Sequence, residues 1–265
     1  MRAAHLANGL SRLLLMIVIL QQKIKEVKME DKKVVYVTGG SRGIGKGITQ
    51  FLLNKGYRVA FSSRKLSDAQ SAAKSLQGNA EDIFPLQSDV RNAEDEISAV
   101  KNILKKWGRL DVLVANAGLG IFAPFEDLSY GQWHQVIDTN VTGVFNSTKA
   151  AVEAVIKTKG YIITIASLAG VNFLPKGTAY NASKFAIVGF TQALMLDLRQ
   201  KDVKVTTIMP GSVASHFGNH VPSEADNWKI QPEDIGEIIF DLLRMNPRTL
   251  PSKIEVRPSK PPVKK

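Results

Sequence analysis

The sequence contains no cysteine and no long apolar run among its 265 residues. Without cysteine there is no disulfide, no thiolate nucleophile and no cysteine-based zinc site, which suits a reducing compartment. We therefore expect the protein in the cytoplasm. The most apolar run, LLLMIVIL at residues 13–20, is far shorter than the roughly 20 residues that a membrane-spanning helix needs. We expect no transmembrane span.

A broad basic surface is also missing, although the net charge is +11. Residues 1–33 carry seven Lys and Arg against three Asp and Glu, and residues 248–265 carry six against one. The residues between these two ends are nearly neutral. Because a nucleic-acid interface needs a basic stripe on the folded body, we expect no nucleic-acid binding.

Residues 1–32 precede the first regular pattern and are predicted to form an N-terminal extension. The run at 13–20 follows Arg2 and Arg12, but no small-residue cleavage site of a secretory signal comes after it. Two interpretations stay open: the functional protein begins at Met29, or residues 1–28 are an unstructured appendage. A surface-anchoring helix is less favoured. We expect deletion of residues 1–28 to preserve fold and activity.

From residue 33 onward, short β-branched runs alternate with stretches of helical periodicity, a pattern typical of repeated βαβ units. The expected strands are 34–37, 58–62, 82–86, 111–115, 161–166, 204–209 and 253–256. The expected helices are 44–54, 67–76, 93–107, 130–157, 179–200 and 232–243. This pattern predicts an α/β fold of Rossmann type, with a doubly wound, mostly parallel seven-stranded sheet and helices on both faces. A single catalytic domain is expected over residues 33–258, and a basic tail over 259–265.

A glycine-rich turn joins the first expected strand to the first expected helix. Glycines at this place let the backbone approach a pyrophosphate, whose charge then lies at the N–H groups of the helix start. The context predicts a dinucleotide site, with candidate contacts at Gly39, Ser41, Arg42, Gly43, Ile44 and Gly45.

The end of the second expected strand bears on the choice of cofactor. The sequence there is FSSRK at residues 61–65, without a carboxylate to accept a hydrogen bond from a ribose 2′-hydroxyl. Arg64 and Arg42 are instead candidates to clamp a 2′-phosphate, which favours NADP(H) over NAD(H). The alternative is that Arg64 and Lys65 are solvated loop cations.

The TGxxxGxG spacing of this turn resembles that of the short-chain dehydrogenase/reductase family, and the resemblance extends over residues 33–258. Further matches follow in the family's order: Asp89-Val90, Asn116-Ala117-Gly118, Asn140, Ser167, Tyr180-x-x-x-Lys184 and Pro210-Gly211. The resemblance implies catalytic roles for Asn140, Ser167, Tyr180 and Lys184. It also implies cofactor contacts beyond the glycine turn, at Ser63, Arg64, Asp89, Val90, Asn116, Ala117, Gly118, Tyr180, Lys184, Pro210, Gly211 and Val213.

Tyr180 and Lys184 are four residues apart on a helical stretch and therefore project from one face. A free phenol has a pKa of about 10, and a neighbouring ammonium together with a positive nicotinamide would lower it toward neutrality. We expect Tyr180 to transfer the proton while a hydride moves between NADP(H) and a carbonyl or secondary alcohol. The resemblance implies that Lys184 also holds the nicotinamide ribose, that Ser167 donates a hydrogen bond to the substrate oxygen, and that Asn140 positions a water in a proton relay.

The expected substrate side is apolar. Residues 212–231 should form a short lid, and the surrounding apolar residues are Leu119, Ile121, Phe122, Leu168, Val171, Phe173, Leu174, Phe217, Val221 and Trp228. They favour a hydrophobic ketone or a 3-oxoacyl-type substrate. The resemblance is closest to 3-oxoacyl-carrier-protein reductases and 3-hydroxy acid dehydrogenases, although a glycine-rich C-terminus is lacking and Ser215 stands where Thr is common. We expect a homodimer or homotetramer.

Other classes of function fit less well. A non-catalytic NADP-binding sensor or scaffold with the same fold is the alternative, and the complete set of four catalytic candidates argues against it. No G-x-S-x-G motif marks a serine hydrolase. His216 and His220, with Glu224 nearby, lie in a segment rich in glycine and proline, so we expect no metal site.

Overall fold

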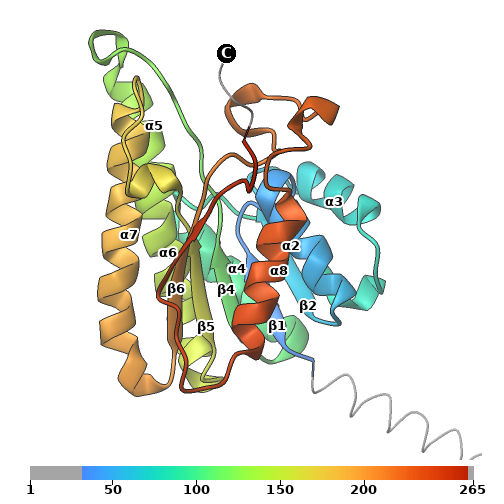
Figure 1. The fold of residues 1–265 in the computed structure, drawn as a ribbon. Coiled ribbons are helices and arrows are strands. Elements are labelled where there is room, and N and C mark those ends of the chain that lie inside the picture. The colour runs from blue at the N-terminus through green and yellow to red at the C-terminus, as the bar shows by residue number, and fades with distance from the viewer. Residues whose placement is uncertain (1–31, 262–265) are drawn as a thin grey trace, which may run out of the picture. The chain divides into compact units, whose positions relative to one another are not determined.

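Seven strands of the described residues form one sheet in the order β3-β2-β1-β4-β5-β6-β7, and every neighbouring pair is parallel (Figure 1). The structure is a computed structural model that describes residues 32–261. The strands are β1 (Val34–Val37), β2 (Arg58–Ser63), β3 (Ile83–Gln87), β4 (Val112–Ala115), β5 (Tyr161–Ile165), β6 (Lys204–Pro210) and β7 (Lys253–Val256). The predicted fold class is confirmed. The predictions for residues 1–31 and for the last residues of the basic tail, 262–265, lie outside the described part.

Helices cover both faces of the sheet (Figure 1). α2 (Gly43–Asn54), α3 (Leu66–Ser75) and α8 (Pro232–Arg244) contribute to one core, and α4 (Ala93–Trp107), α6 (Gly143–Lys157) and α7 (Thr178–Leu198) contribute to the other. Along β1, Val35 and Val37 point into the first core, while Val34 and Tyr36 point into the second. Because successive strand residues face opposite sides, a strand covered on both faces needs a continuous apolar run.

The predicted helix over residues 130–157 is not one α-helix. α5 (Tyr130–Ile137) leads into a π-helical turn at Asp138–Thr142, and α6 begins immediately after it. A π turn shifts the hydrogen-bond ladder by one residue, and such turns are frequent at functional sites. Asn140 lies inside this turn and is 1% exposed. Periodicity alone predicted continuous helix here because the turn adds only one residue to the repeat.

Other differences from the predicted boundaries are small. Asp82 belongs to a 3₁₀ turn, Ala80–Asp82, that precedes β3, where it forms an ion pair with Arg58 at 3.6 Å. Asp111 lies just before β4 and accepts a hydrogen bond from the Val34 N–H at 2.8 Å. Both carboxylates bind neighbouring groups at a strand start, which moves the strand boundary by one residue.

The segment between β6 and α8 contains the predicted lid. It has two 3₁₀ turns, Phe217–Asn219 and Glu224–Asp226, and a single bridge between Val213 and Ile230 that ties its two ends together. Three more 3₁₀ turns lie at Phe125–Asp127, Leu168–Gly170 and Arg199–Lys201. Within residues 32–261, no helix has the length and apolar character to cross a bilayer.

Candidate active site

The glycine turn follows β1 at the carboxyl edge of the sheet, between the two halves of the strand order. Gly39 and Gly43 have φ values of +65° and +53°, which disfavour residues with a side chain. A Cβ on Gly45 would lie 2.4 Å from the Gly39 carbonyl oxygen. Among the described residues, no side chain caps the amino end of α2 and no acidic residue lies in its first turn. The turn therefore presents backbone N–H groups and a positive helix end, as an anion site requires.

Asn116 holds this turn in place from the end of β4. Its side-chain amide donates to the carbonyls of Thr38 and Gly39 at 2.8 and 3.2 Å, while the N–H groups of Asn116 and Ala117 donate to the Thr38 hydroxyl, each at 3.0 Å. The Asn116 amide group thus forms its hydrogen bonds with the protein's own backbone. It supports the glycine turn, and this role was not predicted.

The other predicted cofactor contacts lie at the ends of β2 and β3. Arg64 is exposed just after β2, and Arg42 is exposed in the glycine turn. The Asp89 carboxylate is bound by the Arg91 guanidinium, which lowers its pKa, and Arg64 adds a smaller lowering through its charge. Arg64 and Asp89 therefore share one electrostatic environment. Next to them, Val90 is 6% exposed and its carbonyl accepts from Asn146 at 2.8 Å.

Three of the four catalytic candidates meet at the carboxyl end of β5. Tyr180 and Lys184 lie one turn apart near the start of α7, with exposures of 7% and 6%. The Lys184 Nζ donates to the Ile165 carbonyl at 2.9 Å and lies 5.7 Å from the centre of the Tyr180 ring. Ser167, two residues after β5, is close enough to Tyr180 to lower its pKa, and its hydroxyl donates to the Pro210 carbonyl at 3.4 Å and accepts from the Ala169 N–H at 3.1 Å. The hydroxyls of Ser167 and Tyr180 can thus act on one substrate oxygen.

The protonation behaviour of this pair differs from the prediction. Burial raises the pKa of Tyr180, and only the Ser167 hydrogen bond lowers it. Burial also lowers the pKa of Lys184 from 10.5 to about 8. Lys184 by itself does not lower the Tyr180 pKa here, because its Nζ donates to the Ile165 carbonyl and is itself desolvated. The lowering expected from Lys184 together with a positive nicotinamide stays a prediction.

Asn140 lies beside this pair, and both the oxygen and the nitrogen of its side-chain amide form hydrogen bonds within the protein. Its Oδ1 accepts from the Leu119 N–H at 2.9 Å, and its Nδ2 donates to the Leu119 carbonyl at 2.8 Å and to Ser183 Oγ at 2.9 Å. A Cβ on Gly118 would lie 3.2 Å from Asn140 Oδ1 and 3.7 Å from Lys184 Nζ. The π turn thus clamps the segment after β4 against α7. Because both amide hydrogens are used, a relay water has to bind elsewhere on the residue.

Two phenylalanines cover Tyr180. The rings of Phe122, after β4, and Phe217, in the lid, both lie 5.4 Å from the Tyr180 ring between centroids, and 6.4 Å from each other. A Cβ on Gly120 would lie 2.5 Å from Phe217, so glycine leaves the space that this ring occupies. Both rings were among the predicted apolar residues. By contrast, Phe173 and Val221 are 83% and 73% exposed, and Leu168 and Val171 pack against the core.

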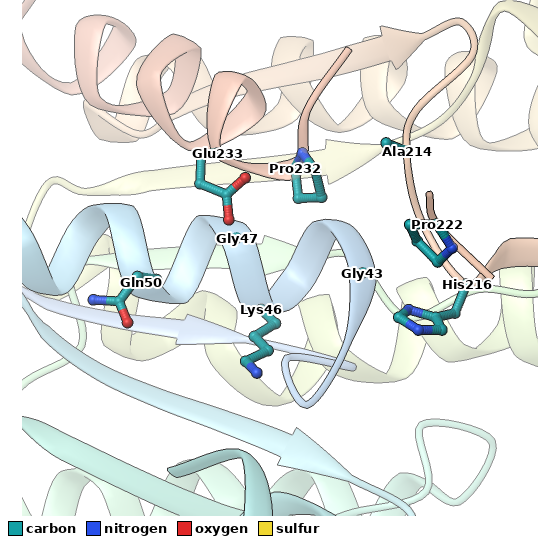
Figure 2. Close-up of a pocket in the computed structure, with 9 residues that line it drawn as sticks. All are labelled: Gly43, Lys46, Gly47, Gln50, Ala214, His216, Pro222, Pro232 and Glu233. Carbon is teal, nitrogen blue, oxygen red and sulfur yellow. The ribbon is translucent and has the colours of Figure 1, made fainter. Parts of the chain in front are cut away.

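Three lid residues, Ala214, His216 and Pro222, face α2. A pocket of about 300 Å³ lies between the outer side of α2, the start of α8 and the lid. Figure 2 shows His216 and Pro222 bordering it on the lid side and Glu233 on the α8 side. The His220 ring contacts the buried Asp226 carboxylate at 2.6 Å, and Lys229 also binds this carboxylate. Val213 packs against the core beside β6, so its predicted cofactor contact is not evident from its surroundings.

Sequence patterns missed several residues that shape this site. Ser183 receives the Asn140 amide and donates to the Tyr180 carbonyl at 2.7 Å. Asp226 organises the lid, and Gly120 admits Phe217. Nothing in the local sequence marks these three, because their partners are distant in the chain or depend on how a loop folds. A helical wheel of α7, which places Ser183 on the side of Tyr180 and Lys184, was the one available signal.

Known proteins with similar sequences and structures are consistent with this geometry. Residues 33–226 match the family model described as short chain dehydrogenase. An uncharacterized oxidoreductase of Staphylococcus saprophyticus is 32% identical over 234 residues, which span 88% of this chain and 99% of that protein.

Solved structures extend the comparison. An alcohol dehydrogenase from the archaeon Thermococcus sibiricus, complexed with 5-hydroxy-NADP, is 28% identical with a TM-score of 0.79, and the match covers 88% of this chain and all of that chain. A 3-ketoacyl-(acyl-carrier-protein) reductase from Brucella melitensis, complexed with NADH, has a TM-score of 0.78 at 23% identity, over 86% of this chain and 97% of that one. The second likeness shows a shared fold.

Proposed function

This chain belongs to the short-chain dehydrogenase family, and on that premise we propose that it is an NADP(H)-dependent oxidoreductase acting on a carbonyl compound or secondary alcohol. The observation that carries the proposal is the meeting of Tyr180, Ser167 and Lys184 at the carboxyl end of β5, beside the loops that follow β1 and β4. When bound, the nicotinamide supplies the hydride for reduction and accepts it in oxidation.

Proton transfer and binding of the substrate oxygen are the work of Tyr180, Ser167 and Lys184. In reduction, the Tyr180 hydroxyl gives a proton to the substrate oxygen while the Ser167 hydroxyl donates a hydrogen bond to it. Burial raises the pKa of Tyr180, so the phenol keeps near neutral pH the proton that reduction consumes. Lys184 lies one helical turn behind, where a pKa of about 8 lets it exchange a proton in the working pH range.

The glycine turn fits a dinucleotide. A Cβ on Gly45 would enter the turn, and the amino end of α2 offers N–H groups to a pyrophosphate. The NADP(H) preference is supported by two exposed arginines, Arg42 and Arg64, and by the absence of a carboxylate between Phe61 and Lys65. The Thermococcus sibiricus alcohol dehydrogenase, which is complexed with 5-hydroxy-NADP, adds support from a relative.

A hydrophobic ketone or 3-oxoacyl-type compound is the proposed substrate. The rings of Phe122 and Phe217 each lie 5.4 Å from the Tyr180 ring and offer apolar surface beside it. An apolar substituent on the substrate would contact these rings while its carbonyl oxygen reached Tyr180 and Ser167.

We also propose that the protein forms a homodimer or homotetramer. The support is a set of large apolar side chains exposed on α6 and α7: Phe145 at 52%, Phe185 at 40% and Leu196 at 53%. Light scattering coupled to gel filtration measures the mass directly. A F145E substitution is expected to shift it toward the monomer, whereas a monomeric wild type would contradict the proposal.

The experiment follows NADPH absorbance with a panel of ketones, diketones and 3-oxoacyl thioesters. We expect the Y180F variant to lose at least about 100-fold in kcat, as removal of a general acid does, while NADPH binding stays within a few-fold of wild type. Y130F is the matched control, since Tyr130 is 88% exposed. Full turnover by Y180F would contradict the catalytic assignment. Binding of NADPH without turnover of any compound would favour the sensor alternative.

A further inference from the structure

A wholly buried carboxyl group lies outside the catalytic cluster, in the first turn of α4. The Glu96 side chain is 0% exposed, and its Oε1 accepts hydrogen bonds from the hydroxyls of Tyr36, at 3.0 Å, and Ser88. Within the described residues, its Oε2 has no hydrogen-bond partner by distance and angle, and the nearby Ser147 hydroxyl on α6 lowers its pKa. Burying a carboxyl group is costly, and burial raises its pKa. A half-satisfied buried polar group calls for a reason.

The two hydroxyls that donate to Glu96 come from β1 and from the residue after β3. Tyr36 lies on β1, three residues before Gly39, and its hydroxyl is 3.1 Å from Ser62 Oγ at the end of β2. Ser88 follows β3 directly, and its N–H donates to the Ser63 carbonyl at 3.0 Å. Tyr36, Ser62 and Ser88 are all nearly or fully buried. We name Tyr36, Ser62, Ser88 and Glu96 the buried hydroxyl cluster.

Each hydroxyl of this cluster lies next to a proposed cofactor contact. Ser62 precedes Ser63 and Arg64, and Ser88 precedes Asp89 and Val90. β3 is an edge strand that pairs only with β2, so the loop after β3 has fewer backbone neighbours to hold it than the loop after a central strand. The cluster ties both ends to β1 and to α4.

We propose that Glu96 is a positioning residue for the adenosine half of NADP(H), which fixes the loops carrying Arg64 and Asp89 through the hydroxyls of Tyr36, Ser62 and Ser88. This inference rests on the proposed function, because that function assigns these loops to the cofactor. The nearest member of the cluster, Glu96, is 84 positions from Tyr180 in the sequence. The cluster lies on β1, β2, α4 and the residue after β3, whereas Tyr180 and Lys184 lie on α7, so we expect its effect on cofactor affinity and not on the chemical step.

The test compares E96L and E96Q with wild type by calorimetric titration of NADPH and of 2′,5′-ADP, a fragment that carries only the adenosine half. Leucine leaves the Tyr36 and Ser88 hydroxyls without their acceptor, and we expect both dissociation constants to rise about tenfold, with kcat at saturating NADPH within about twofold. Glutamine keeps an acceptor oxygen in place, so E96Q should stay within about threefold of wild type. E94Q is the matched control, since Glu94 is exposed on the same turn.

The outcomes separate this inference from the proposed function. A folded E96L that binds 2′,5′-ADP like wild type overturns the inference, and so does a kcat that falls as much as the affinity. If E96L does not fold, Y36F decides, because it removes a single hydroxyl of the cluster and should weaken both ligands while E94Q does not. A wild type that binds neither NADPH nor 2′,5′-ADP would overturn the proposed function itself.

Discussion

Replacing Lys184 with methionine should remove activity without weakening the fold at neutral pH. The Lys184 side chain is 6% exposed, and burial lowers its pKa from 10.5 to about 8. At about 1.4 kcal/mol for each tenfold change in proton affinity, this fall corresponds to a penalty of roughly 3 kcal/mol on the charged form. Methionine has similar length and no charge, so K184M avoids the penalty.

Loss of the hydrogen bond that Lys184 makes offsets part of the stability that K184M gains by avoiding this penalty. Its Nζ donates to the Ile165 carbonyl at 2.9 Å, and a hydrogen bond from a charged group contributes about 1.5–3 kcal/mol. At pH 7 we therefore expect K184M to range from equal stability to about 1.5 kcal/mol above wild type. The kcat should fall about 100-fold or more, since the proton relay is lost.

The pH dependence provides the sharper measurement. Below pH 8 both the folded and the unfolded chain carry the lysine proton, and the folded state bears the full penalty. Between pH 8 and 10.5 the folded protein loses the proton while the unfolded chain keeps it, so the unfolding free energy of wild type rises with pH. Relative to K184M, wild type should gain about 1.4 kcal/mol between pH 7 and pH 9.

Urea unfolding followed by circular dichroism at pH 7, 8 and 9, without added cofactor, tests this directly. K74M is the matched control, because Lys74 is exposed on α3. The difference in unfolding free energy between wild type and K74M should not change with pH. If the difference in unfolding free energy between wild type and K184M stays constant from pH 7 to pH 9, the conclusion that Lys184 is buried and desolvated is refuted. A loss of more than about 3 kcal/mol in K184M at pH 7 would show that hydrogen bonding outweighs desolvation.

Three further predictions concern the cofactor and the lid. R64A should raise KM for NADPH about tenfold and leave KM for NADH unchanged, because only the 2′-phosphate meets the guanidinium; equal effects in steady-state kinetics would contradict the NADP(H) preference. G45A should abolish dinucleotide binding in a calorimetric titration, because its Cβ would lie 2.4 Å from the Gly39 carbonyl oxygen, and wild-type affinity would show that the turn adapts. F217A removes a ring that lies 5.4 Å from Tyr180, so KM for apolar ketones should rise. The same change exposes a phenol whose pKa burial raises, so the pH profile of alcohol oxidation should move to lower pH; unchanged profiles would mean that the lid does not cover Tyr180 in solution.

Much of the fold was predictable because parallel strands that are covered on both faces leave continuous apolar runs in the sequence. VVYV of β1 and VLVA of β4 are such runs, and both are completely buried. The glycine turn was equally predictable from the sequence, since a strand, a tight turn and a helix follow each other without interruption. Where the prediction was wrong, as in the helix over residues 130–157, a local π turn followed from the contacts of Asn140 with Leu119 and Ser183.

The candidate site, like the fold, combines features that the sequence predicted with features that only the structure revealed. The spacing of Tyr180 and Lys184 placed both on one face of a helix, and the structure brings them together with Ser167. The direction of the Tyr180 pKa was not predictable, because it depends on how deeply both side chains are buried and on the carbonyl that Lys184 binds. The packing of Phe217 on Tyr180 joins residues that are 37 positions apart in the chain.

By itself, the sequence determined the strand and helix order, the glycine turn and the helical spacing of the proton-transfer pair, since each is a pattern within a few consecutive residues. Only the tertiary structure decided which hydroxyls surround Glu96, where the Lys184 Nζ points and which ring covers Tyr180. These outcomes depend on strand register and on the loss of water around buried groups, which arise only when distant segments pack together.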